Sequence, residues 1–286
     1  MKKFKNVSLY SSTGLKRVDK IALQVLEILE NIGINVFLTE SLAGMNVKKK
    51  LIKSDSYILK NTDLLISIGG DGSLLSLARK FGRHGLPIMG INLGSLGFLT
   101  DVRPEELTTS LIDVFKGEYS KEERFFLESS VGDTKKKNIA LNEIVIHSGS
   151  VAQLIEYELF IDNNFVFRQK ADGLIISTPT GSTAYSLSGG GSIIHPDVGA
   201  ISIIPMFPHS LSSSPLVINK ECEMKLEIVD TKKSMLSFDS HDSIILKRGD
   251  VVSIKKADKP LNLIHPLDHD FYSACRDKLG WSMNIS

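Results

Sequence analysis

The sequence predicts an α/β domain, built on a doubly wound parallel β-sheet, followed by an antiparallel β-rich domain. Strand-like apolar runs alternate with helical periodicity over about the first 115 residues, which is typical of a parallel sheet with helices on both faces. After Gly117 the helical periodicity nearly disappears and short strands follow one another. We therefore expect an α/β domain over residues 1–118, a β-rich domain over 119–267 and a C-terminal segment, 268–286, that packs back on the first domain.

The elements of the first domain follow from apolar spacing and from residues that begin or end helices. Gly33 stands where a helix C-cap glycine belongs, and Pro104 with two acidic residues marks a helix start. Residues 45–59 are compatible with a helix or a loop. The expected strands are 6–10, 35–38, 64–69 and 87–91, and the expected helices begin near Gly14, after Gly72 and at Pro104.

The first domain is organised around the buried strand at 64–69 and the turn Gly69-Gly70-Asp71-Gly72. The glycines allow a phosphate to approach the backbone, and the helix behind them aims N–H groups at an anion. A carboxylate repels phosphate, so Asp71 suits metal binding or the acceptance of a proton from a hydroxyl. The alternative is a tight turn with a solvated aspartate. Four special residues directly after a buried strand make that alternative the weaker interpretation.

A second glycine-containing turn, residues 92–99, follows the next expected strand. Ligands of open parallel sheets bind at the carboxyl ends of the strands. Both glycine turns fall on that edge, so we expect them to lie close together.

The β-rich domain contains two further polar stretches. Asn142 and Glu143 interrupt the apolar strand 139–146, and such a pair requires partners or a ligand, unless one face of the strand is wet. Residues 172–186 run from a strand into small hydroxyl residues that can donate hydrogen bonds to a polar ligand, and Tyr185 can pack against a ring of that ligand. The alternative is a serine-rich surface loop. Asp162-Asn163 predicts a hairpin turn.

The composition excludes several classes of protein. The formal net charge is +1, from 34 basic and 33 acidic residues, which does not indicate nucleic acid or a membrane surface as partner. No apolar stretch approaches the length of a membrane span. The two cysteines fit a reducing, cytoplasmic location, and the seven histidines are scattered without the spacing of a zinc site.

Together these stretches resemble the NAD kinase family over nearly the whole chain. The Gly-Gly-Asp-Gly element matches residues 69–72, the Gly-x-x-Gly-Phe-Leu turn matches 94–99, and Asn142-Glu143 matches the Asn-Glu element. The long signature from Asp172 to Tyr185 matches without a substitution and is specific to the family. Two departures are Ser214, where many members have arginine, and His241, where many have glutamine shortly after an aspartate.

The resemblance implies phosphorylation of the adenosine 2′-hydroxyl of NAD by ATP, giving NADP and ADP, with a divalent metal ion, usually Mg²⁺, in a homo-oligomer. It implies that Asp71 accepts the hydroxyl proton and that transfer is direct, since no residue resembles a phosphoryl-accepting nucleophile. By the same resemblance, the ATP phosphates are bound by Gly69, Gly70, Gly72 and Ser73. NAD is bound by Asp71, Gly72, Asn142, Glu143, Gln153, Lys170, Asp172, Thr183, Ala184, Tyr185, Ser186, Leu187 and Ser188.

Three rival interpretations remain to be separated from an NAD kinase. A lipid kinase shares the Gly-Gly-Asp-Gly turn, but the loop at 178–185 and the absence of an amphipathic membrane helix argue against it. A non-catalytic NAD-sensing module does not require Asp71. A dehydrogenase requires a Gly-x-Gly-x-x-Gly turn after a strand and an acid about 20 residues later, which this sequence lacks.

Overall fold

The computed structural model describes residues 4–14, 16–94, 96–132, 134, 136–149, 153–210, 213–231 and 233–281. Ser95, in the second glycine turn, and residues 282–286 of the expected C-terminal segment therefore lie outside the described residues. The chain divides into two compact units, Met1–Glu123 with Pro260–Ser286, and Arg124–Lys259. No helix among the described residues is both long enough and apolar enough to cross a membrane.

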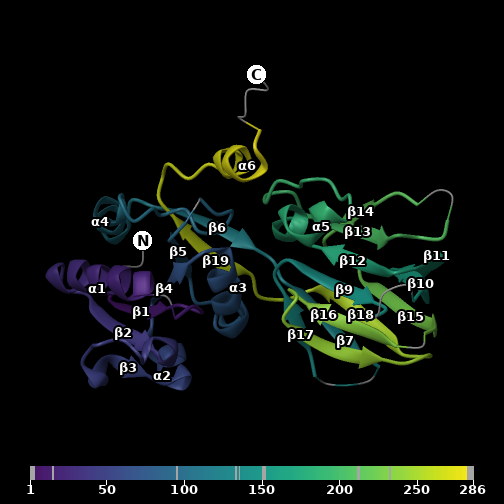
Figure 1. The fold of residues 1–286 in the computed structure, drawn as a ribbon, viewed down its shortest axis with the longest axis horizontal. Coiled ribbons are helices and arrows are strands. Elements are labelled where there is room, and N and C mark those ends of the chain that lie inside the picture. Colours follow the sequence, from purple (N-terminus) through teal and green to yellow (C-terminus); the bar gives the residue numbers. More distant parts are fainter. Residues whose placement is uncertain are drawn as a thin grey trace. The chain divides into compact units, whose positions relative to one another are not determined.

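The first unit is built on a seven-stranded sheet, as the sequence predicts. Its strand order is β3-β2-β1-β4-β5-β19-β6, and the pairs from β3 through to β19 are parallel. Strand β19 comes from the C-terminal part of the chain and lies beside β5 (Figure 1), so the chain returns to this unit near residue 260 rather than 268. The strands are β1 (Asn6–Tyr10), β2 (Asn35–Thr39), β3 (Ile52–Lys53), β4 (Leu64–Gly69), β5 (Ile88–Asn92), β6 (Ser120–Arg124) and β19 (Leu261–His265).

Both faces of this sheet are covered. Leu64, Ile66 and Ile68 of β4 share one apolar cluster with helices α1 and α4. Leu65 and the α3 residue Leu74 are also fully buried but lie outside that cluster, as expected for the opposite face. The helices are α1 (Lys16–Asn31), α2 (Asp55–Asn61), α3 (Asp71–Lys80), α4 (Leu107–Lys116) and α6 (Phe271–Leu279).

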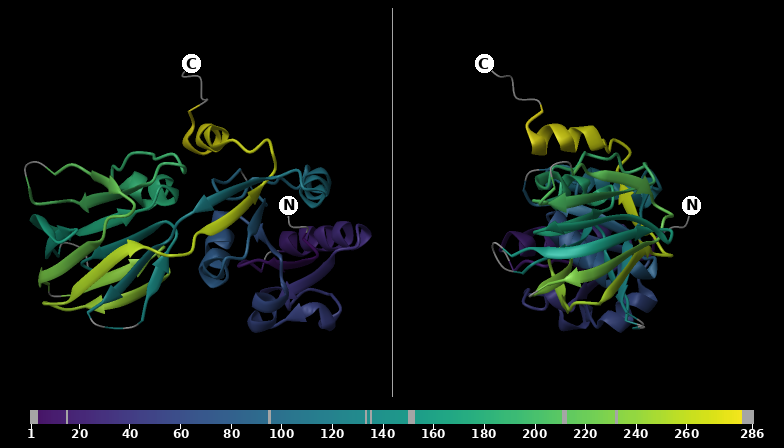
Figure 2. Two further views of the ribbon diagram at one scale, coloured as in Figure 1. Left: turned by 180° about the vertical axis from the view of Figure 1, so that it is seen from behind. Right: turned by 90° about the vertical axis from the view of Figure 1, so that its right-hand side faces the viewer.

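The second unit consists of two six-stranded antiparallel sheets, ordered β11-β10-β15-β18-β7-β8 and β14-β13-β12-β9-β16-β17. The strands of this unit are drawn in teal, green and yellow in Figure 2. Apolar side chains of both sheets, such as Tyr157 of β10 and Ile144 of β9, form one core. The strands are β7 (Leu127–Val131), β8 (Asn138–Ala140), β9 (Glu143–His147), β10 (Ile155–Ile161), β11 (Asn164–Ala171), β12 (Gly173–Ser177), β13 (Ala200–Met206), β14 (Leu216–Asn219), β15 (Met224–Asp230), β16 (Ser234–Phe238), β17 (Asp242–Leu246) and β18 (Val251–Lys256). The short helix α5 is Tyr185–Ser188.

The chain changes sheet at the two polar stretches of this unit. The strand expected at 139–146 is divided into β8 and β9, which belong to different sheets, and Asn142 lies at the crossing. Asp172 likewise stands between β11 and β12. The backbone changes its ladder partners at both points: the N–H of Asn142 donates to the side chain of Asp239, and the N–H of Asp172 donates to the carbonyl of Met206 at the end of β13.

Candidate active site

The first glycine turn connects β4 to α3, as the sequence predicts. Gly69 has a φ of +154°, and a Cβ there would lie 2.4 Å from Oγ of Ser73. Ser73 is buried, and its hydroxyl lies 2.7 Å from that of Ser12. Gly70 and Gly72 are exposed, and no atom of the described residues lies within 4 Å of a Cβ built at either. Their backbone therefore presents open space to a ligand.

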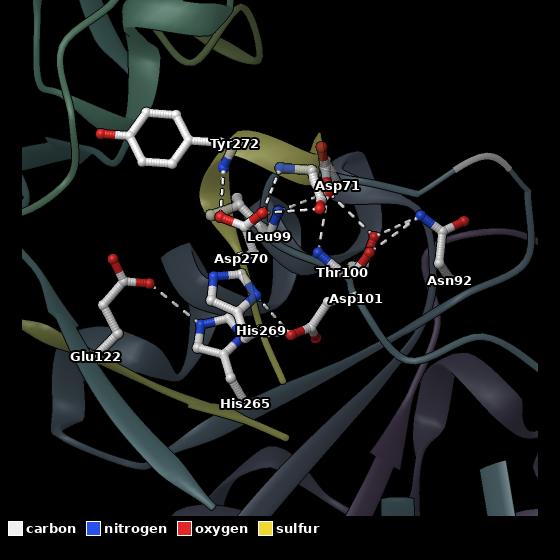
Figure 3. Close-up of polar contacts among 11 residues, drawn as sticks. Asp71, Asn92, Leu99, Thr100, Asp101, Glu122, His265, His269, Asp270 and Tyr272 are labelled. Carbon is white, nitrogen blue, oxygen red and sulfur yellow. Dashed lines mark hydrogen bonds and ion pairs between the residues drawn. The ribbon is translucent and has the colours of Figure 1, made fainter. Parts of the chain in front are cut away.

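The second glycine turn holds the carboxylate of Asp71 (Figure 3). The backbone N–H of Phe98 donates to Oδ2 at 2.9 Å, and those of Leu99 and Thr100 donate to Oδ1 at 3.1 and 3.2 Å. The hydroxyl of Thr100 also donates to Oδ1, at 3.1 Å. Among the described residues Oδ2 thus accepts one hydrogen bond and retains a lone pair, while Oδ1 is saturated. The two turns meet, as expected from their position at one sheet edge.

Gly97 and Asn92 keep this arrangement close-packed. A Cβ on Gly97 would lie 2.1 Å from Oδ1 of Asp71, so only glycine leaves room for the carboxylate. Asn92, at the end of β5, donates to Oγ1 of Thr100 at 2.9 Å and accepts from the N–H of Gly94 at 2.7 Å. The sequence identifies the turn but not the support that Asn92 and Thr100 give to Asp71.

In the second unit, Asn142 and Glu143 are held by Asp239, which the sequence analysis did not single out as a site residue. The Asp239 carboxylate accepts the backbone N–H groups of Leu141, Asn142 and Glu143 at 2.9, 2.8 and 3.2 Å. Asp239 is buried and has a φ of +48°. A buried aspartate at the end of β16 therefore determines the path of the chain at the sheet crossing.

Glu143 lies in this buried setting with a carboxylate of its own. Burial, and then repulsion by Asp239, raise the pKa of Glu143 from 4.5 to about 8, although a backbone hydrogen bond from Tyr185 favours ionisation. Oε2 of Glu143 is buried and has no hydrogen-bond partner among the described residues. At neutral pH the free protein therefore keeps this carboxyl mainly protonated, as a donor that a ligand can use.

We expect Glu143→Gln to remove a pH dependence of stability. The folded protein retains a proton between pH 4.5 and about 8 that the unfolded chain loses, so the free energy of unfolding falls as the pH rises through that window. The loss is at most about 5 kcal/mol for a shift of this size. Thermal denaturation should show Glu143→Gln to be more stable than the wild type at pH 8.5 but not at pH 5. Glu27→Gln, at an exposed position, should change the melting temperature neither at pH 8.5 nor at pH 5. If the melting temperatures of the wild type and Glu143→Gln depend on pH in the same way, this electrostatic account is wrong.

The loop after β12 packs directly on the Asn142 crossing. The hydroxyl of Thr178 donates to the carbonyl of Leu141 at 2.6 Å, and its N–H donates to that of Asn142 at 2.9 Å. Gly181 is buried, and a Cβ there would lie 2.3 Å from the carbonyl oxygen of Asn142. The interpretation as a serine-rich surface loop is therefore wrong for residues 177–182, which are buried.

The same loop ends in a pocket. Asp172 and Tyr185 line a cavity of about 710 Å³ together with His147 and His241, and Tyr185 is 40% exposed. Ser186 is buried, whereas Ser188 is exposed. The second unit thus offers an open pocket in which a carboxylate, an aromatic ring and hydroxyl groups are available to a polar ligand.

Two family models match the chain, that of the ATP-NAD kinase N-terminal domain over residues 15–119 and that of the ATP-NAD kinase C-terminal domain over 141–266. The NAD kinase of Ectopseudomonas mendocina is 42% identical to the chain over 291 residues, covering 100% of this chain and 99% of that protein. The chain belongs to the NAD kinase family. The NAD kinase of Acinetobacter baylyi is 44% identical over 292 residues, covering 99% of this chain and 94% of that one. The resemblance inferred from the motifs is confirmed.

Solved structures of the family have the same fold. Yeast NADH kinase complexed with NADH matches with a TM-score of 0.90 and 26% identity, covering 100% of this chain and 90% of that one. An NAD kinase from Archaeoglobus fulgidus in complex with ATP matches with a TM-score of 0.73 and 26% identity, covering 96% of each chain. The fold class is thereby confirmed, and the activity is that of the NAD kinase family, the conversion of NAD and ATP into NADP.

The structure separates Lys170 from the Asp172 pocket. Nζ of Lys170 lies 3.4 Å from Oε2 of Glu156, and the side chain is 58% exposed. Lys170 lines a different cavity, of about 540 Å³, with His209 and Ser214. Gln153 is half-buried in the segment before β10. Asp172 and Lys170 thus line different cavities, and strand β11 ends at the residue between them.

Proposed function

We propose that the chain transfers the γ-phosphoryl group of ATP directly to the adenosine 2′-hydroxyl of NAD, with Asp71 as the proton acceptor. The hydroxyl oxygen forms a bond to the γ-phosphorus, the bond from that phosphorus to the β–γ bridging oxygen breaks, and ADP leaves. The hydroxyl proton passes to Oδ2 of Asp71. The observation that carries this proposal is the fixed carboxylate of Asp71, which keeps one lone pair of Oδ2 open beside the glycine turn.

The glycine turn is the proposed site of the ATP phosphates. The exposed backbone of Gly70 and Gly72 borders open space. Gly70 is the N-cap of α3 and Gly72 lies in its first turn, so the N-terminus of α3 faces an anion bound there. The hydroxyl of Ser73 is engaged by Ser12 and its N–H by the carbonyl of Gly70. We therefore propose that Ser73 and Gly69, which pack against each other, hold the turn in the conformation that binds the phosphates.

A magnesium ion fits this donor set if the phosphates of ATP supply most of its ligands. Mg²⁺ in nucleotide sites is commonly held by one or two carboxylates, substrate phosphates and water. Asp71 is the one carboxylate of the turn, and since its open Oδ2 lone pair is assigned to the hydroxyl proton, the ion would be held by the ATP phosphates and by water rather than by Oδ2 directly. When bound, the ion would neutralise charge on the transferring phosphoryl group.

The second unit supplies the proposed NAD site. The support is the pocket that Asp172 and Tyr185 line, and the buried Glu143 carboxyl, whose Oε2 has no partner among the described residues. The family resemblance adds Gln153 and Lys170 to this set. The proposed NAD-binding residues of this unit are Asn142, Glu143, Gln153, Lys170, Asp172, Thr183, Ala184, Tyr185, Ser186, Leu187 and Ser188.

The reaction is tested by incubating the purified protein with ATP, Mg²⁺ and NAD, and measuring NADP with an NADP-specific dehydrogenase. NADH as acceptor and polyphosphate as donor are assayed in parallel. We expect NADP and ADP in equal amounts. Binding of NAD without formation of NADP would instead indicate an NAD-sensing module, and transfer to a lipid would indicate a lipid kinase.

We also propose a homo-oligomer and a cytoplasmic location. Phe207, Val217 and Ile245 of the second unit are apolar side chains with exposed fractions of 78%, 52% and 63%, which an interface between copies would cover. The two cysteines are free, as expected in a reducing compartment. Light scattering coupled to size-exclusion chromatography measures the oligomer, and a monomer at micromolar concentration would contradict the first proposal.

We expect the preference for NAD⁺ over NADH to depend on Asp172 and not on Lys170. The oxidised nicotinamide ring carries a positive charge, which the Asp172 carboxylate would stabilise, whereas Lys170 is exposed and already paired with Glu156. Asp172→Asn should lower the ratio of kcat/KM for NAD⁺ over NADH up to about fivefold, as for a half-exposed charge pair. Lys170→Ala should leave that ratio unchanged or raise it, and the reverse pattern would place the lysine at the ring.

A further inference from the structure

Four ionisable side chains far apart in the sequence converge in the first unit (Figure 3). Asp101 follows the turn that holds Asp71, Glu122 lies on β6, His265 ends β19, and His269 precedes α6. Nδ1 of His265 and Nδ1 of His269 each lie 2.8 Å from Oδ2 of Asp101. The two imidazole rings are stacked, with centroids 3.9 Å apart and an interplanar angle of 18°.

We propose that Asp101, His265 and His269 form a binding site for one divalent transition-metal ion of the zinc type. Nδ1 of each histidine and a carboxylate oxygen of Asp101 supply three ligand atoms, which all lie within 4.8 Å of one another. Two imidazoles and one carboxylate are a ligand set of many zinc sites, in which a water molecule or a further ligand takes the fourth position. The site differs in residues and in chemistry from the glycine turn that binds ATP.

The burial of these groups supports a ligand at this position. The side chains of His265 and Asp101 are only 2% and 9% exposed. Oδ1 of Asp101 is buried without a hydrogen-bond partner among the described residues. A buried carboxylate oxygen left in this state is costly, and a bound cation removes the cost. The cluster differs from a group of acids on the surface, because Oδ1 of its central carboxylate has lone pairs that no described protein group uses and that a cation could bind.

Glu122 occupies the place of an outer partner for a metal-bound histidine. Its Oε2 lies 3.2 Å from Nε2 of His265, on the side of the ring opposite to Asp101. Histidine ligands commonly interact with a carboxylate through their second nitrogen, which fixes the tautomer and orients the ring. With Glu122 at Nε2, the lone pair of His265 is directed from Nδ1 toward Asp101 and His269.

The chemistry of the donors favours zinc, cobalt or nickel over magnesium. Imidazole nitrogen binds these ions well, whereas Mg²⁺ prefers oxygen ligands and water. One Asp101 carboxylate and the Glu122 carboxylate together balance the charge of a divalent ion. A cavity of about 210 Å³, lined by Asp101, His269, Asp268 and Asp270, gives an ion access from solvent and leaves room for a fourth ligand.

The competing interpretation is a buried ion-pair network without metal. Burial lowers the pKa of His265, but the carboxylates of Asp101 and Glu122 beside its two ring nitrogens outweigh it and raise the pKa to about 9. An incoming ion therefore has to displace a proton. Ligand atoms of a tetrahedral zinc ion are about 3.3 Å apart, so Asp101 needs to move by about 0.5 Å from its hydrogen-bonded position. Because the two rings are stacked at 18°, one imidazole must also rotate before both Nδ1 lone pairs point at the same ion. Binding measurements distinguish the two interpretations.

Titration of the metal-free, untagged protein with Zn²⁺, followed by calorimetry, tests the site. We expect one Zn²⁺ per chain, a rise in the melting temperature with Zn²⁺ but not with Mg²⁺, and visible absorption from a low-symmetry Co²⁺ complex. His269→Ala, whose side chain is 17% exposed and tolerates truncation better than His265, should abolish this binding. Glu122→Gln should weaken it by about 10–100-fold, as for an outer partner.

His84→Ala is the matched control, because it removes an imidazole of the same unit outside the cluster. It should bind Zn²⁺ as the wild type does. Failure of the folded wild type to bind Zn²⁺ or Co²⁺, or unchanged binding by His269→Ala, would overturn the metal site. Loss of thermal stability in His269→Ala, with no effect of metal on the wild type, would assign the cluster to an ion-pair network. None of these readouts depends on NADP formation.

Discussion

Asp71→Asn lowers the turnover number about 10²–10⁴-fold, the usual contribution of a general base, while the protein keeps its fold. The asparagine oxygen can replace Oδ1 and accept from Leu99 and Thr100. The amide nitrogen then faces the N–H of Phe98 in place of Oδ2, so that one hydrogen bond is lost. That loss destabilises the protein by about 1–3 kcal/mol. The effect on turnover is larger because the amide nitrogen has no lone pair for the proton of the 2′-hydroxyl.

Steady-state kinetics together with thermal denaturation separate these two effects. Asp63→Asn is a matched control in the same unit, because Oδ2 of Asp63 also accepts two backbone N–H groups, those of Lys5 and Asn6, at 3.0 Å. It should retain near-normal turnover. If a folded Asp71→Asn turns over like the wild type, Asp71 is not the proton acceptor. If it fails to fold, Thr100→Val, which removes the hydroxyl donor to Asp71 and the acceptor of the Asn92 amide, still tests whether orientation of the carboxylate affects turnover.

Gly181→Val raises the KM for NAD at least tenfold and leaves the KM for ATP nearly unchanged. The φ of Gly181 is not in the left-handed region, so the cause is space rather than backbone strain. Its Cβ would lie 2.3 Å from the carbonyl oxygen of Asn142 and 2.6 Å from Oγ of Ser177. Both neighbours are held by hydrogen bonds, so the loop and the Asn142 crossing must move apart, at a cost of about 1–3 kcal/mol. The displaced groups are those assigned to NAD.

The measurement is a pair of KM values for NAD and ATP with Gly181→Ala and Gly181→Val, beside a circular-dichroism melt. Gly44→Ala is a suitable control, because no atom of the described residues lies within 4 Å of its Cβ position and its φ is ordinary. Alanine already carries the clashing Cβ, so both substitutions should act in the same direction. Equal increases of the two KM values would mean that the loop is scaffold for the whole enzyme rather than part of the NAD site.

Local patterns predicted the parts of the fold that depend on neighbouring residues. The strand 6–10 and the helix that ends before Gly33 were confirmed, and Gly33 has the expected positive φ, +77°. The Asp162-Asn163 turn was confirmed by φ values of +49° and +65°. The helix expected from Pro104 begins three residues later, at Leu107, because the chain first forms a turn. The segment 45–59 contains both expected alternatives, a loop and the start of α2, and also the short strand β3, which was not expected.

Pairings between distant segments were not predictable from such patterns. The residues of strand β19 have the same short alternating apolar pattern as the antiparallel strands before them, and only the pairing of β19 with β5 shows that it belongs to the first sheet. The glycine turns were correctly expected at one sheet edge, since topology determines that edge. Asp239 and Asp101 were missed because their partners lie about 100 residues away or more. His265 and His269 are only four residues apart, but that spacing indicates a site only once Asp101 is known to lie beside both rings.

The position of β19 between β5 and β6 also determines when the first unit can be completed during synthesis. Its residues, 261–265, leave the ribosome only after the whole second unit. Until then β5 lacks its β19 neighbour at Ile88, although Val102 already pairs with Gly90 and Asn92 farther along the strand, and β6 has no strand between itself and the sheet. Incompletely paired edges promote aggregation of nascent chains. The unit that carries Asp71 is therefore translated first and completed last.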